Sequence, residues 1–504
     1  MKAVSARLLN GITMYRLMLY YLGALLATGF GLSLLHQVFV APLALCTSLL
    51  VLIATCWAAN RMISWLTRVP TNRESAIITA LILALIMPPA PPTDMVGILA
   101  LVVAAVVAIA SKFLITIGHK HIFNPVAIGA VASGVVMGHP AIWWVAGNPV
   151  LLSVVILGGL AVTKKVQRFD MIAAYLIANV AAVLVATPPA MLGMALRQGL
   201  IYSPLFFAGF AMLTEPMTAA HGKYSRLIYG AIVGLLSAPG IHVGSVFFSP
   251  QLAFLIANLY AFAASPKGRF RMTLLKIERV ASDCYEFIFS PDQPLRFRAG
   301  QYLDWTLHVP VADSRGNRRP FTIASAPSDD SVRLGVKFYE QPSAFKRQLL
   351  SLSPGDVVFG SQIAGTFTLP PDPASKILFI AGGIGITPFR SMLRDLINRK
   401  EPRDIVLIYG NRRAGDIAYS DLLDLAVREI GLRVIHVISD DPPDAHDHVP
   451  GFIDAELIRR SVPDLDERIV YLSGPQVMIA RVRGMLRRSG VLRRNIRTDY
   501  FPGF

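Results

Sequence analysis

Three residues in the last third of the chain have the types and spacing of a phosphate-binding loop. Gly383, Gly385 and Pro388 lie in the stretch FIAGGIGITPF, which passes from apolar residues into glycines and then into a helical pattern. Glycines let backbone N–H groups approach a phosphate closely, and a helix N-terminus favours its negative charge. Alone, a glycine-rich turn is a weak signal, and it predicts a dinucleotide site only where a strand precedes it and a helix follows.

The residues around this loop supply such elements. Alternating patterns from residue 376 onward indicate strands at 376–382, 404–410, 433–439 and 468–474, with helices at 387–400, 418–430 and 475–490. Before them, turns rich in Gly, Pro and Asp separate short strand-like runs at 271–280, 284–291, 301–309 and 333–340. This order predicts a β-barrel over residues 267–372 and a parallel α/β domain over residues 373–504.

Several motifs in this half, in this order, resemble those of the ferredoxin-NADP reductase superfamily. They are AGQYLDWTL (299–307), RRPFT (318–322), PSAFKRQL (342–349), GGIGITP (382–388) and YLSGPQVM (471–478). The resemblance covers roughly residues 270–504. It implies a flavoprotein that binds FAD on the barrel and NADH or NADPH on the α/β domain.

The resemblance assigns the FAD contacts to two stretches of the barrel. They are Arg319, Pro320, Phe321, Thr322, Ser343, Ala344 and Phe345. The Arg319 guanidinium matches the oxygens of the FAD pyrophosphate, and the Thr322 hydroxyl is implied to lie near the flavin N5. Phe321 stands where relatives have Tyr, so it can pack on the flavin but has no hydroxyl.

The nicotinamide side is assigned in the same way. The implied contacts are Gly383, Gly385, Thr387, Pro388, Arg412, Gly474 and Pro475. Ser473 replaces the Cys of the usual Cys-Gly-Pro motif and is the second catalytic candidate beside Thr322. The chain ends in DYFPGF, and the resemblance implies that Phe501 or Phe504 covers the flavin. Arg412 and Arg413 are equally compatible with a 2′-phosphate contact, which would favour NADPH, and with solvated loop charges.

The first half of the chain has a different composition. Residues 1–266 contain 14 Lys and Arg and four acidic residues, which leaves 34 of the 48 basic and 28 of the 32 acidic residues for 267–504. This contrast predicts a membrane domain over 1–266 and a soluble second half. The net charge of +16 can therefore be a topology signal, and we predict no nucleic-acid partner.

Apolar stretches in this half predict about ten membrane-spanning helices. They lie near 17–36, 38–59, 75–88, 94–111, 124–138, 150–163, 169–187, 203–217, 226–238 and 245–264. Basic residues fall in alternate gaps between them, whereas the intervening gaps hold only Arg197. The alternation places both termini and the reductase half in the cytoplasm of a cell with a bacterial-type inner membrane.

The same half contains a weak internal repeat. The stretch 75–89 resembles 203–217, and 123–131 resembles 225–233, which predicts two inverted five-helix halves. TALILALIMPPAPP, KHIFNPVAIG and FAMLTEPMTAA resemble the B subunit of the sodium-pumping NADH:quinone oxidoreductase and the D subunit of the Rnf complex. Those relatives carry flavin in the membrane, commonly linked to a Thr.

This chain departs from the relatives at the attachment site. GHPAIWWVAGNP (138–149) contains no Thr or Ser, and YSPLFFAG (202–209) replaces the second attachment motif, so we expect any flavin in this half to be non-covalent. Polar groups beside membrane spans are functional candidates because their burial in lipid is unfavourable. The candidates are Asn124, Thr214, Glu215 and Thr218. The alternative is that they only cap helix ends.

Together these features predict a membrane-bound NAD(P)H-dependent oxidoreductase that passes electrons into or across the bilayer. The acceptor is a quinone or an extracytoplasmic redox protein. A redox-gated transporter is an alternative. A haem ferric reductase is disfavoured because His36, His119, His121, His139, His221 and His242 form no pairs of the required spacing. The three cysteines form no metal or ferredoxin spacing, so we predict no metal.

Overall fold

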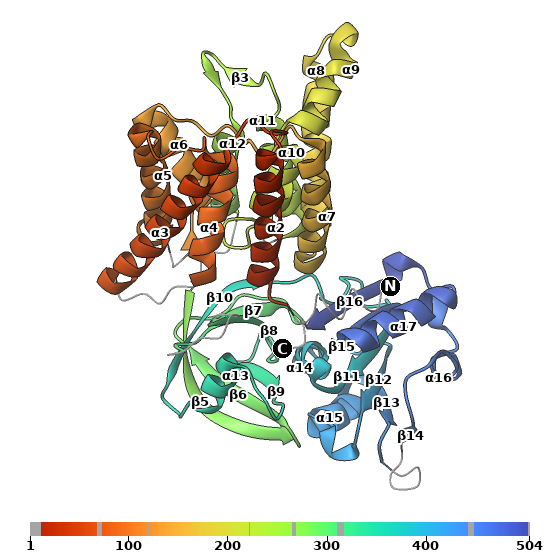
Figure 1. Ribbon diagram of the computed structural model, residues 1–504. Helices are drawn as coiled ribbons and strands as arrows, with labels where there is room; N and C mark the ends of the chain where they lie inside the picture. Colours follow the sequence, from red (N-terminus) through yellow and green to blue (C-terminus); the bar gives the residue numbers. More distant parts are fainter. Residues whose placement is uncertain are drawn as a thin grey trace. The chain divides into compact units, whose positions relative to one another are not determined.

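The computed structural model describes residues 12–67, 73–117, 120–220, 222–264, 269–309, 317–441 and 448–501. Within it the chain divides into two compact units, Met1–Ser265 and Pro266–Phe504. Figure 1 shows a helical first unit and a second unit of two sheets with surrounding helices.

The first unit is built from helices that follow the predicted apolar stretches. The longer ones are α2 (Met14–Leu34), α3 (Pro42–Thr67), α4 (Arg73–Ile86), α5 (Met95–Leu114), α6 (Pro125–Met137), α7 (Pro149–Val166), α8 (Phe169–Ala186), α11 (Lys223–Leu236) and α12 (Pro250–Ala263). Five of them, α2, α3, α5, α7 and α8, are long and apolar enough to cross a membrane. The helices α4, α6 and α12 are apolar but shorter, so a count of ten spans stays a prediction.

The region around residues 187–212 differs from the predicted pattern of one gap and one span. It contains η1 (Pro189–Met191), α9 (Leu192–Arg197), η2 (Gln198–Tyr202), α10 (Leu205–Phe207) and η3 (Ala208–Met212). Both η2 and η3 are π-helical, and Pro204 interrupts the chain between them. Because a proline cannot donate a backbone hydrogen bond, two short helices replace one long span. Two hairpins, β1–β2 (Thr116–Ile117 and Lys120–His121) and β3–β4 (His242–Val243 and Val246–Phe247), join helices elsewhere.

The helices of the first unit pack in an order that repeats. In the first five, α2 packs on α4, α3 on α5, and α5 on α6. In the second set, α7 packs on α10 and η3, α8 on α11, and α11 on α12. The first helices of the two sets, α2 and α7, contact each other, as do the last ones, α6 and α12. The packing therefore has a five-helix period, whereas the inversion of the halves relative to a bilayer stays a prediction.

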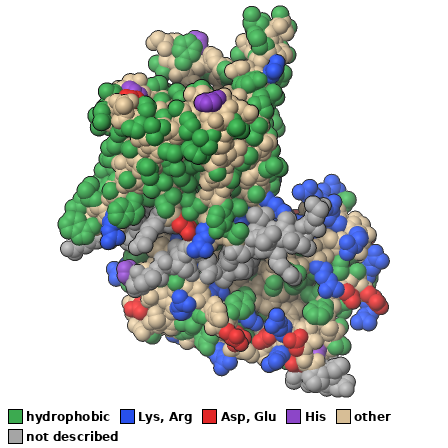
Figure 2. Space-filling view, in the orientation of Figure 1, with side chains coloured by type: hydrophobic (Ala, Val, Ile, Leu, Met, Phe, Trp, Pro, Cys, Tyr) green, Lys and Arg blue, Asp and Glu red, His purple; other side chains and the backbone are tan. Residues whose placement is uncertain are grey.

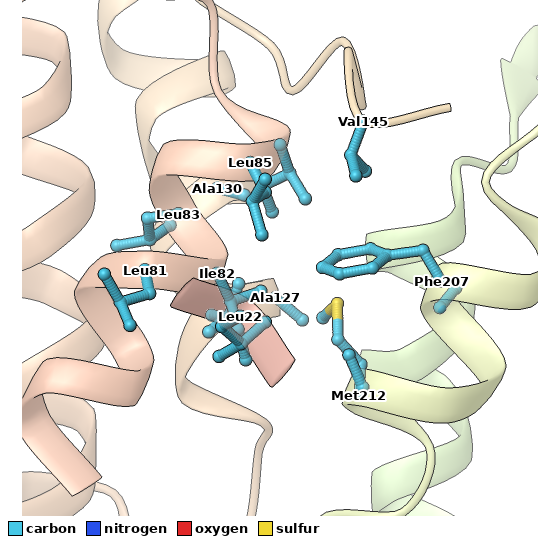
Figure 3. Close-up of a cluster of buried hydrophobic side chains, with 14 of the residues drawn as sticks. Leu22, Leu81, Ile82, Leu83, Leu85, Ala127, Ala130, Val145, Phe207 and Met212 are labelled. Atoms are coloured by element: carbon cyan, nitrogen blue, oxygen red, sulfur yellow. The ribbon is translucent and has the colours of Figure 1, made fainter. Parts of the chain in front are cut away.

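The interior and the surface of the first unit are both apolar. Figure 3 shows Ile82 and Leu85 of α4 beside Ala127 and Ala130 of α6, with the Phe207 ring of α10 pointing toward them. Apolar side chains also cover most of the unit's visible outer surface, as Figure 2 shows in green. A water-soluble protein rarely exposes an apolar surface this continuous.

The second unit begins with a six-stranded antiparallel sheet in the order β8-β7-β10-β5-β6-β9. Its strands are β5 (Arg269–Ala281), β6 (Cys284–Pro291), β7 (Tyr302–Thr306), β8 (Arg318–Thr322), β9 (Val332–Lys337) and β10 (Val357–Ala364), and α13 (Ala344–Leu350) follows β9. Alternate residues such as Leu303, Trp305 and Phe287 point into one core. The strand β8 carries the predicted FAD motif.

A six-stranded parallel sheet follows, in the order β14-β13-β12-β11-β15-β16. It contains β11 (Ile377–Gly382), β12 (Ile405–Asn411), β13 (Arg433–Ile438), β14 (Val449–Pro450), β15 (Ile469–Pro475) and β16 (Ile496–Phe501). Helices α14 (Thr387–Arg399) and α15 (Ser420–Ile430) cover one face, and α16 (Ala455–Ser461) and α17 (Gln476–Arg488) cover the other. The chain leaves β11 toward β12 and returns to its other side at β15, so the order reverses there. Ligands of such sheets bind beyond the carboxyl ends of the strands at this reversal.

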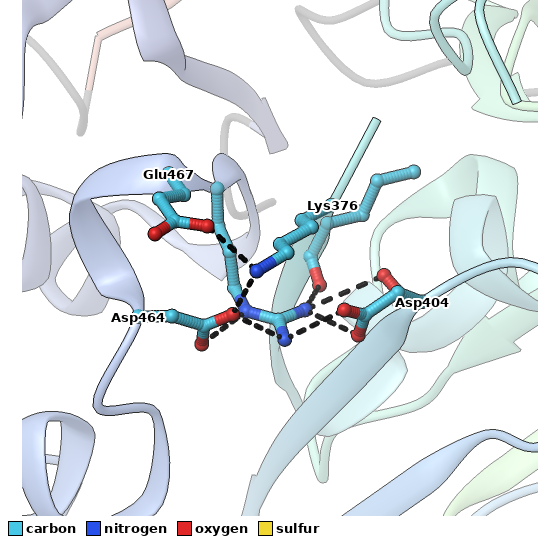
Figure 4. Close-up of polar contacts among 6 residues, drawn as sticks. Lys376, Asp404, Asp464 and Glu467 are labelled. Atoms are coloured by element: carbon cyan, nitrogen blue, oxygen red, sulfur yellow. Dashed lines mark hydrogen bonds and ion pairs between the residues drawn. The ribbon is translucent and has the colours of Figure 1, made fainter. Parts of the chain in front are cut away.

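A charged cluster with a structural role lies at the other end of these strands, next to the amino ends of β11 and β15. Arg468 precedes β15, is buried, and donates to the backbone oxygen of Ile377 at 3.0 Å and to Asp464 at 2.8 Å. Arg468 also pairs with Asp404, and Figure 4 shows Lys376 of the same cluster between Asp464 and Glu467, with which it forms ion pairs. Arg468 and Lys376 hold the pKa of Asp464 down at about 2. The cluster lies at the amino ends of β11 and β15, away from the predicted site.

Candidate functional site

The two nucleotide motifs of the α/β domain meet backbone to backbone. Gly385 follows β11, and an ideal Cβ built on it would lie 2.5 Å from the Cα of Gly474 and 2.6 Å from the backbone oxygen of Ser473. Gly474 itself has a φ of +150° and faces Gly382. Sequence analysis placed these glycines in separate motifs, and the structure brings them together at the carboxyl ends of neighbouring strands.

The remaining residues of the first loop form the start of α14. Gly383 has a φ of +52°, which is the left-handed conformation that glycine adopts most easily. The Thr387 hydroxyl donates to the backbone oxygen of Ile384 at 3.2 Å, and Pro388 occupies the first turn of the helix. Free backbone N–H groups at such a helix start can bind a pyrophosphate.

Ser473 lies near the carboxyl end of β15, in its buried part. Its side chain is fully buried, and its hydroxyl has no hydrogen-bond partner within the described part of the chain. A buried polar atom without a partner is unfavourable, so this atom fits a role toward a bound ligand. Asp499 of β16 lies opposite Ser473 in the parallel register, and burial raises the pKa of this carboxyl to about 7. Sequence analysis missed Asp499 because it did not predict strand β16.

The aromatic C-terminus is only partly described. The backbone of Phe501 ends β16 opposite Pro475, which is a site residue on the neighbouring strand. Phe504 lies outside the described residues. The implied role of either ring as a flavin cover stays a prediction.

On the barrel, the two predicted FAD stretches lie against each other. The Arg319 guanidinium carbon lies 5.5 Å from the centre of the Phe345 ring, and the rings of Phe321 and Phe345 are 5.9 Å apart. Pro320 lies between Arg319 and Phe321 on β8 and is exposed. Ser343 caps α13, where its hydroxyl accepts from the backbone N–H of Lys346 at 3.3 Å.

Two further FAD residues are less accessible. Thr322 is buried at the end of β8, opposite Tyr302, and Ala344 is buried at the first position of α13. The exposed Pro320, the stacked Arg319 and the start of α13 provide a cationic and amide-lined surface. These residues fit a pyrophosphate-bearing flavin cofactor, with Arg319 and the start of α13 toward its phosphates.

The loop after β12 carries the two arginines considered for coenzyme choice. Arg412 and Arg413 are both exposed, and no ion pair to either is found within the described residues. The next residue, Ala414, donates its N–H to the Asp441 carboxylate at 2.6 Å. The loop therefore presents two guanidinium groups to solvent beside one occupied carboxylate.

We expect Arg412→Ala and Arg413→Ala to raise the KM for NADPH about 10- to 100-fold, because each removes one charge-assisted phosphate contact. The KM for NADH should stay within about twofold, because NADH has no 2′-phosphate. The contact that NADPH would lose is worth roughly 1.5–3 kcal/mol. Steady-state kinetics with both coenzymes and an artificial acceptor measures this. Equal changes with the two coenzymes would remove the 2′-phosphate assignment.

In the first unit, three of the four membrane-domain candidates form one buried cluster. Asn124 donates through its side chain to the Glu215 carboxylate at 2.7 Å, and the Thr218 hydroxyl donates to the same oxygen at 3.2 Å. Asn258, which sequence analysis missed, accepts from the Asn124 backbone N–H at 2.8 Å. Thr214 does not join them, because its hydroxyl donates back to Phe210 at 2.7 Å.

The cluster also performs ordinary structural work. The side-chain oxygen of Asn124 caps α6 by accepting from the N–H groups of Val126 and Ala127. The bond from Asn124 to Glu215 joins the two sets of helices. A functional role of these residues stays a prediction.

A cavity of about 310 Å³ lies elsewhere in the first unit. Its walls come from four connections between helices and from α8, and they are rich in aromatic side chains, including Trp143, Trp144, Tyr175, Tyr202 and Phe248. The stretches 142–146 and 202–205, in which sequence analysis sought and did not find a flavin-linking Thr, are both part of this wall.

The backbone around this cavity is unusual. Trp143 has a φ of +54°, which is strained for a bulky residue. The π-helices η2 and η3 flank residues 203–207, and π-helical turns are frequent at functional sites. The Trp143 indole donates to the Gln251 side chain at 3.2 Å, which holds the strained residue in place.

A flavin-type barrel followed by a parallel sheet with paired glycine loops defines the second unit as a two-domain reductase. Residues 379–484 match the family model described as "Oxidoreductase NAD-binding domain". The chain is 30% identical over 237 residues to the reductase subunit of an aromatic O-demethylase from Amycolatopsis, which covers 46% of this chain and 69% of that protein. The C-terminal half therefore belongs to the ferredoxin reductase-like family of FAD- and NAD(P)H-binding oxidoreductases.

Other relatives are of the same kind. The chain is 29% identical to a terephthalate 1,2-dioxygenase reductase component from Comamonas, over 41% of this chain and 60% of that one. Among solved structures, the Amycolatopsis cytochrome P450 reductase GcoB has 26% identity and a TM-score of 0.42, over 47% of this chain and 71% of that chain. The second unit is thus an NAD(P)H-dependent FAD oxidoreductase. None of these matches covers as much as half of this chain.

Proposed function

We propose that the whole chain is a membrane-bound NAD(P)H-dependent flavoprotein that passes electrons from NAD(P)H into or across a lipid bilayer. The carrying observation is that the reductase unit shares one chain with five helices long and apolar enough to cross a membrane. When bound, FAD accepts a hydride from NAD(P)H and can release electrons singly. A simple membrane anchor would need one helix, so the remaining helices call for a further role.

The distribution of charge supports an orientation for this proposal. Basic residues of the first unit lie mostly at the helix ends next to alternate connections, including Arg61 toward the end of α3, Lys112 in the last turn of α5 and Lys164 in the last turn of α7. Cytoplasmic connections are enriched in Lys and Arg. On this basis both termini and the reductase unit are cytoplasmic, in a membrane of the bacterial inner-membrane type.

The aromatic cavity supports electron exit at the outer face. Besides Tyr175 and Asn179 of α8, its lining residues come from the connections α2–α3, α6–α7, η2–α10 and α11–α12 and from the helix ends beside them. All four are connections that the charge pattern assigns to the outer side. We infer that a non-covalent flavin or another planar redox group binds there, since aromatic walls of this kind suit a planar ring.

The relatives favour a second candidate. They are named as reductase components of a demethylase, a dioxygenase and monooxygenases, so the reductase unit of this chain could instead serve an oxygenase-type partner. In that case the helices of the first unit would serve to hold the enzyme at the membrane. Reduction of a quinone at the membrane, or redox gating of a transporter, are the remaining alternatives that the apolar unit allows.

Purified full-length protein in sealed liposomes tests the proposal, with the reductase unit facing outward and ferricyanide trapped inside. NADH added outside should reduce the trapped ferricyanide without added quinone, because bound cofactors can carry electrons across the bilayer. Acid extraction of the same preparation should release about two flavins per chain, one for each unit. The Gly385→Val variant, incorporated in parallel, controls for leakage.

The possible outcomes separate the candidates. Trapped ferricyanide that stays oxidised while added quinone is reduced briskly would leave a quinone reductase. Failure with both acceptors, together with rapid reduction of a soluble ferredoxin, would favour the oxygenase-type role.

A further inference from the structure

A buried arginine joins the nucleotide loop of the α/β domain to the flavin-binding barrel. Arg390 lies one turn into α14, directly after the loop 383–386, and its side chain is 9% exposed. Its Nη1 donates to the backbone oxygen of Ala324 at 2.6 Å, and Ala324 follows the FAD motif residue Thr322 by two positions. The next helix residue, Ser391, donates to the backbone oxygen of Ser325 at 2.7 Å.

The same guanidinium reaches a buried carboxylate of the barrel. Arg390 Nε lies 3.1 Å from Glu286 Oε1, and the other carboxylate oxygen lies 2.6 Å from Arg333 Nη1. Glu286 is 1% exposed and lies on β6, directly opposite Gly335 of β9. The ion pair is therefore short, shielded from water and shared between the two domains of the reductase unit.

Tyr419 completes the contact from the α/β side. The Arg390 guanidinium lies over the Tyr419 ring, 5.0 Å from its centre. Tyr419 has a φ of +63°, an uncommon conformation for a bulky residue that persists only where surrounding contacts hold it. Burial and the nearby Glu286 raise the pKa of Tyr419 well above its usual range, so the hydroxyl stays protonated.

Gly335 leaves the space that this packing needs. An ideal Cβ at Gly335 would lie 2.5 Å from the Tyr419 hydroxyl and 2.8 Å from Cγ2 of Thr387. The barrel strand β9 therefore touches the first residue of α14 and the tyrosine before α15. The absence of a side chain at Gly335 thus lets the barrel approach the start of α14 closely.

We propose that Arg390 is a positioning residue, which with Glu286 and Tyr419 sets the distance between the nicotinamide loop and the flavin-binding strand β8. The residue does not need to contact either cofactor. It ties α14 to the backbone just after Thr322, and so places the loop at Gly383–Gly385 relative to that strand. The inference rests on the flavin-reductase class of this unit and is independent of the membrane proposal.

The proposed role has a kinetic consequence. A displacement of about 1 Å between reacting groups can lower a rate about 100-fold, whereas binding at each separate site need not change. Loss of the Arg390 contacts should therefore slow hydride transfer without preventing either cofactor from binding. A residue that only stabilised the fold would lower cofactor occupancy and thermal stability together.

The test compares full-length Arg390→Lys and Arg390→Gln with the parent in stopped-flow reduction by NADH. Lysine keeps the charge beside Glu286 but cannot also reach Ala324 and cover Tyr419. We expect the rate of flavin reduction at saturating NADH to fall about 10- to 100-fold, with FAD content and the Kd for NAD⁺ within about threefold of the parent. In the flavin-free proteins, amide hydrogen exchange of residues 384–390 should accelerate.

Arg394→Gln is the matched control on the same helix. Arg394 lies one turn further and is half-exposed, and its ion pair to Asp329, the one found for it among the described residues, is 3.7 Å long, so its loss should leave the reduction rate and the exchange unchanged. Gly335→Ala changes the distance between the two domains from the barrel side, because its Cβ pushes against Tyr419 and Thr387. This variant should slow flavin reduction even where an Arg390 variant fails to fold. Parent-like reduction rates in both the Arg390→Lys and Gly335→Ala proteins would overturn the proposal. So would slower reduction accompanied by unchanged hydrogen exchange.

Discussion

Replacing Gly385 with valine should lower NAD(P)H-driven flavin reduction at least about 100-fold while FAD stays bound, since it displaces the nucleotide loop from its reacting position. A Cβ at this position would lie 2.5 Å from the Cα and 2.6 Å from the nitrogen of Gly474. Neither atom belongs to a flexible side chain, so backbone must move. The two loops that meet there carry the assigned nicotinamide contacts, whereas the assigned FAD contacts lie on the barrel.

The measurement is anaerobic reduction of bound FAD by NADH, with FAD content from the absorbance of the purified protein. Gly484→Val is the matched control, because a Cβ there meets only the end of the Arg488 side chain at 3.7 Å. Reduction by dithionite should remain complete in both variants. A Gly385→Val protein that NADH reduces at the parent's rate would show that this loop does not bind the nicotinamide coenzyme.

Replacing Arg319 with alanine should weaken FAD binding about 10- to 100-fold, because a charge-assisted hydrogen bond to phosphate contributes roughly 1.5–3 kcal/mol. The guanidinium is already held in place over the Phe345 ring, 5.5 Å from its centre. Little side-chain entropy should then be lost when it binds a phosphate. The purified variant should therefore contain less than one FAD per chain.

Titration of the flavin-free protein with FAD, followed by quenching of flavin fluorescence, gives the Kd. Arg296→Ala serves as control, since Arg296 is an exposed arginine of the same barrel. The reduction rate of the FAD-loaded fraction should stay close to that of the parent. Equal Kd values for Arg319→Ala and the parent would remove Arg319 from the FAD site.

Local sequence pattern was sufficient for most elements of the reductase unit. The apolar run 376–382 predicted a strand, and β11 forms there with every residue from Ile377 to Gly382 buried. The pattern over 387–400 likewise predicted a helix, and α14 forms over Thr387–Arg399 with Phe389 and Leu396 among its buried residues. These patterns succeed because burial of a strand or a helix face depends on residues that are neighbours along the chain.

Prediction failed where an element depended on a partner far away in sequence. Strand β16 has charged residues such as Arg497 and Asp499, and it forms only because β15 offers a free edge. In the first unit, the segment 187–212 was predicted as one gap and one span, but prolines and π-helical turns divide it. Propensity alone could not show which apolar segment bends around a cavity.

By itself, the sequence determined the chemistry available to this protein: a glycine loop, an Arg-Pro-Phe-Thr strand, and a first half rich in apolar residues and poor in charge. Only the tertiary structure decided which of these residues meet. It brought Gly385 against Gly474 and Arg390 against Glu286, and it placed Trp143 and Tyr202 in the wall of one cavity. The reason is physical: residue type sets what a side chain can bind, whereas contacts between distant segments depend on the packing of whole elements, which no local pattern records.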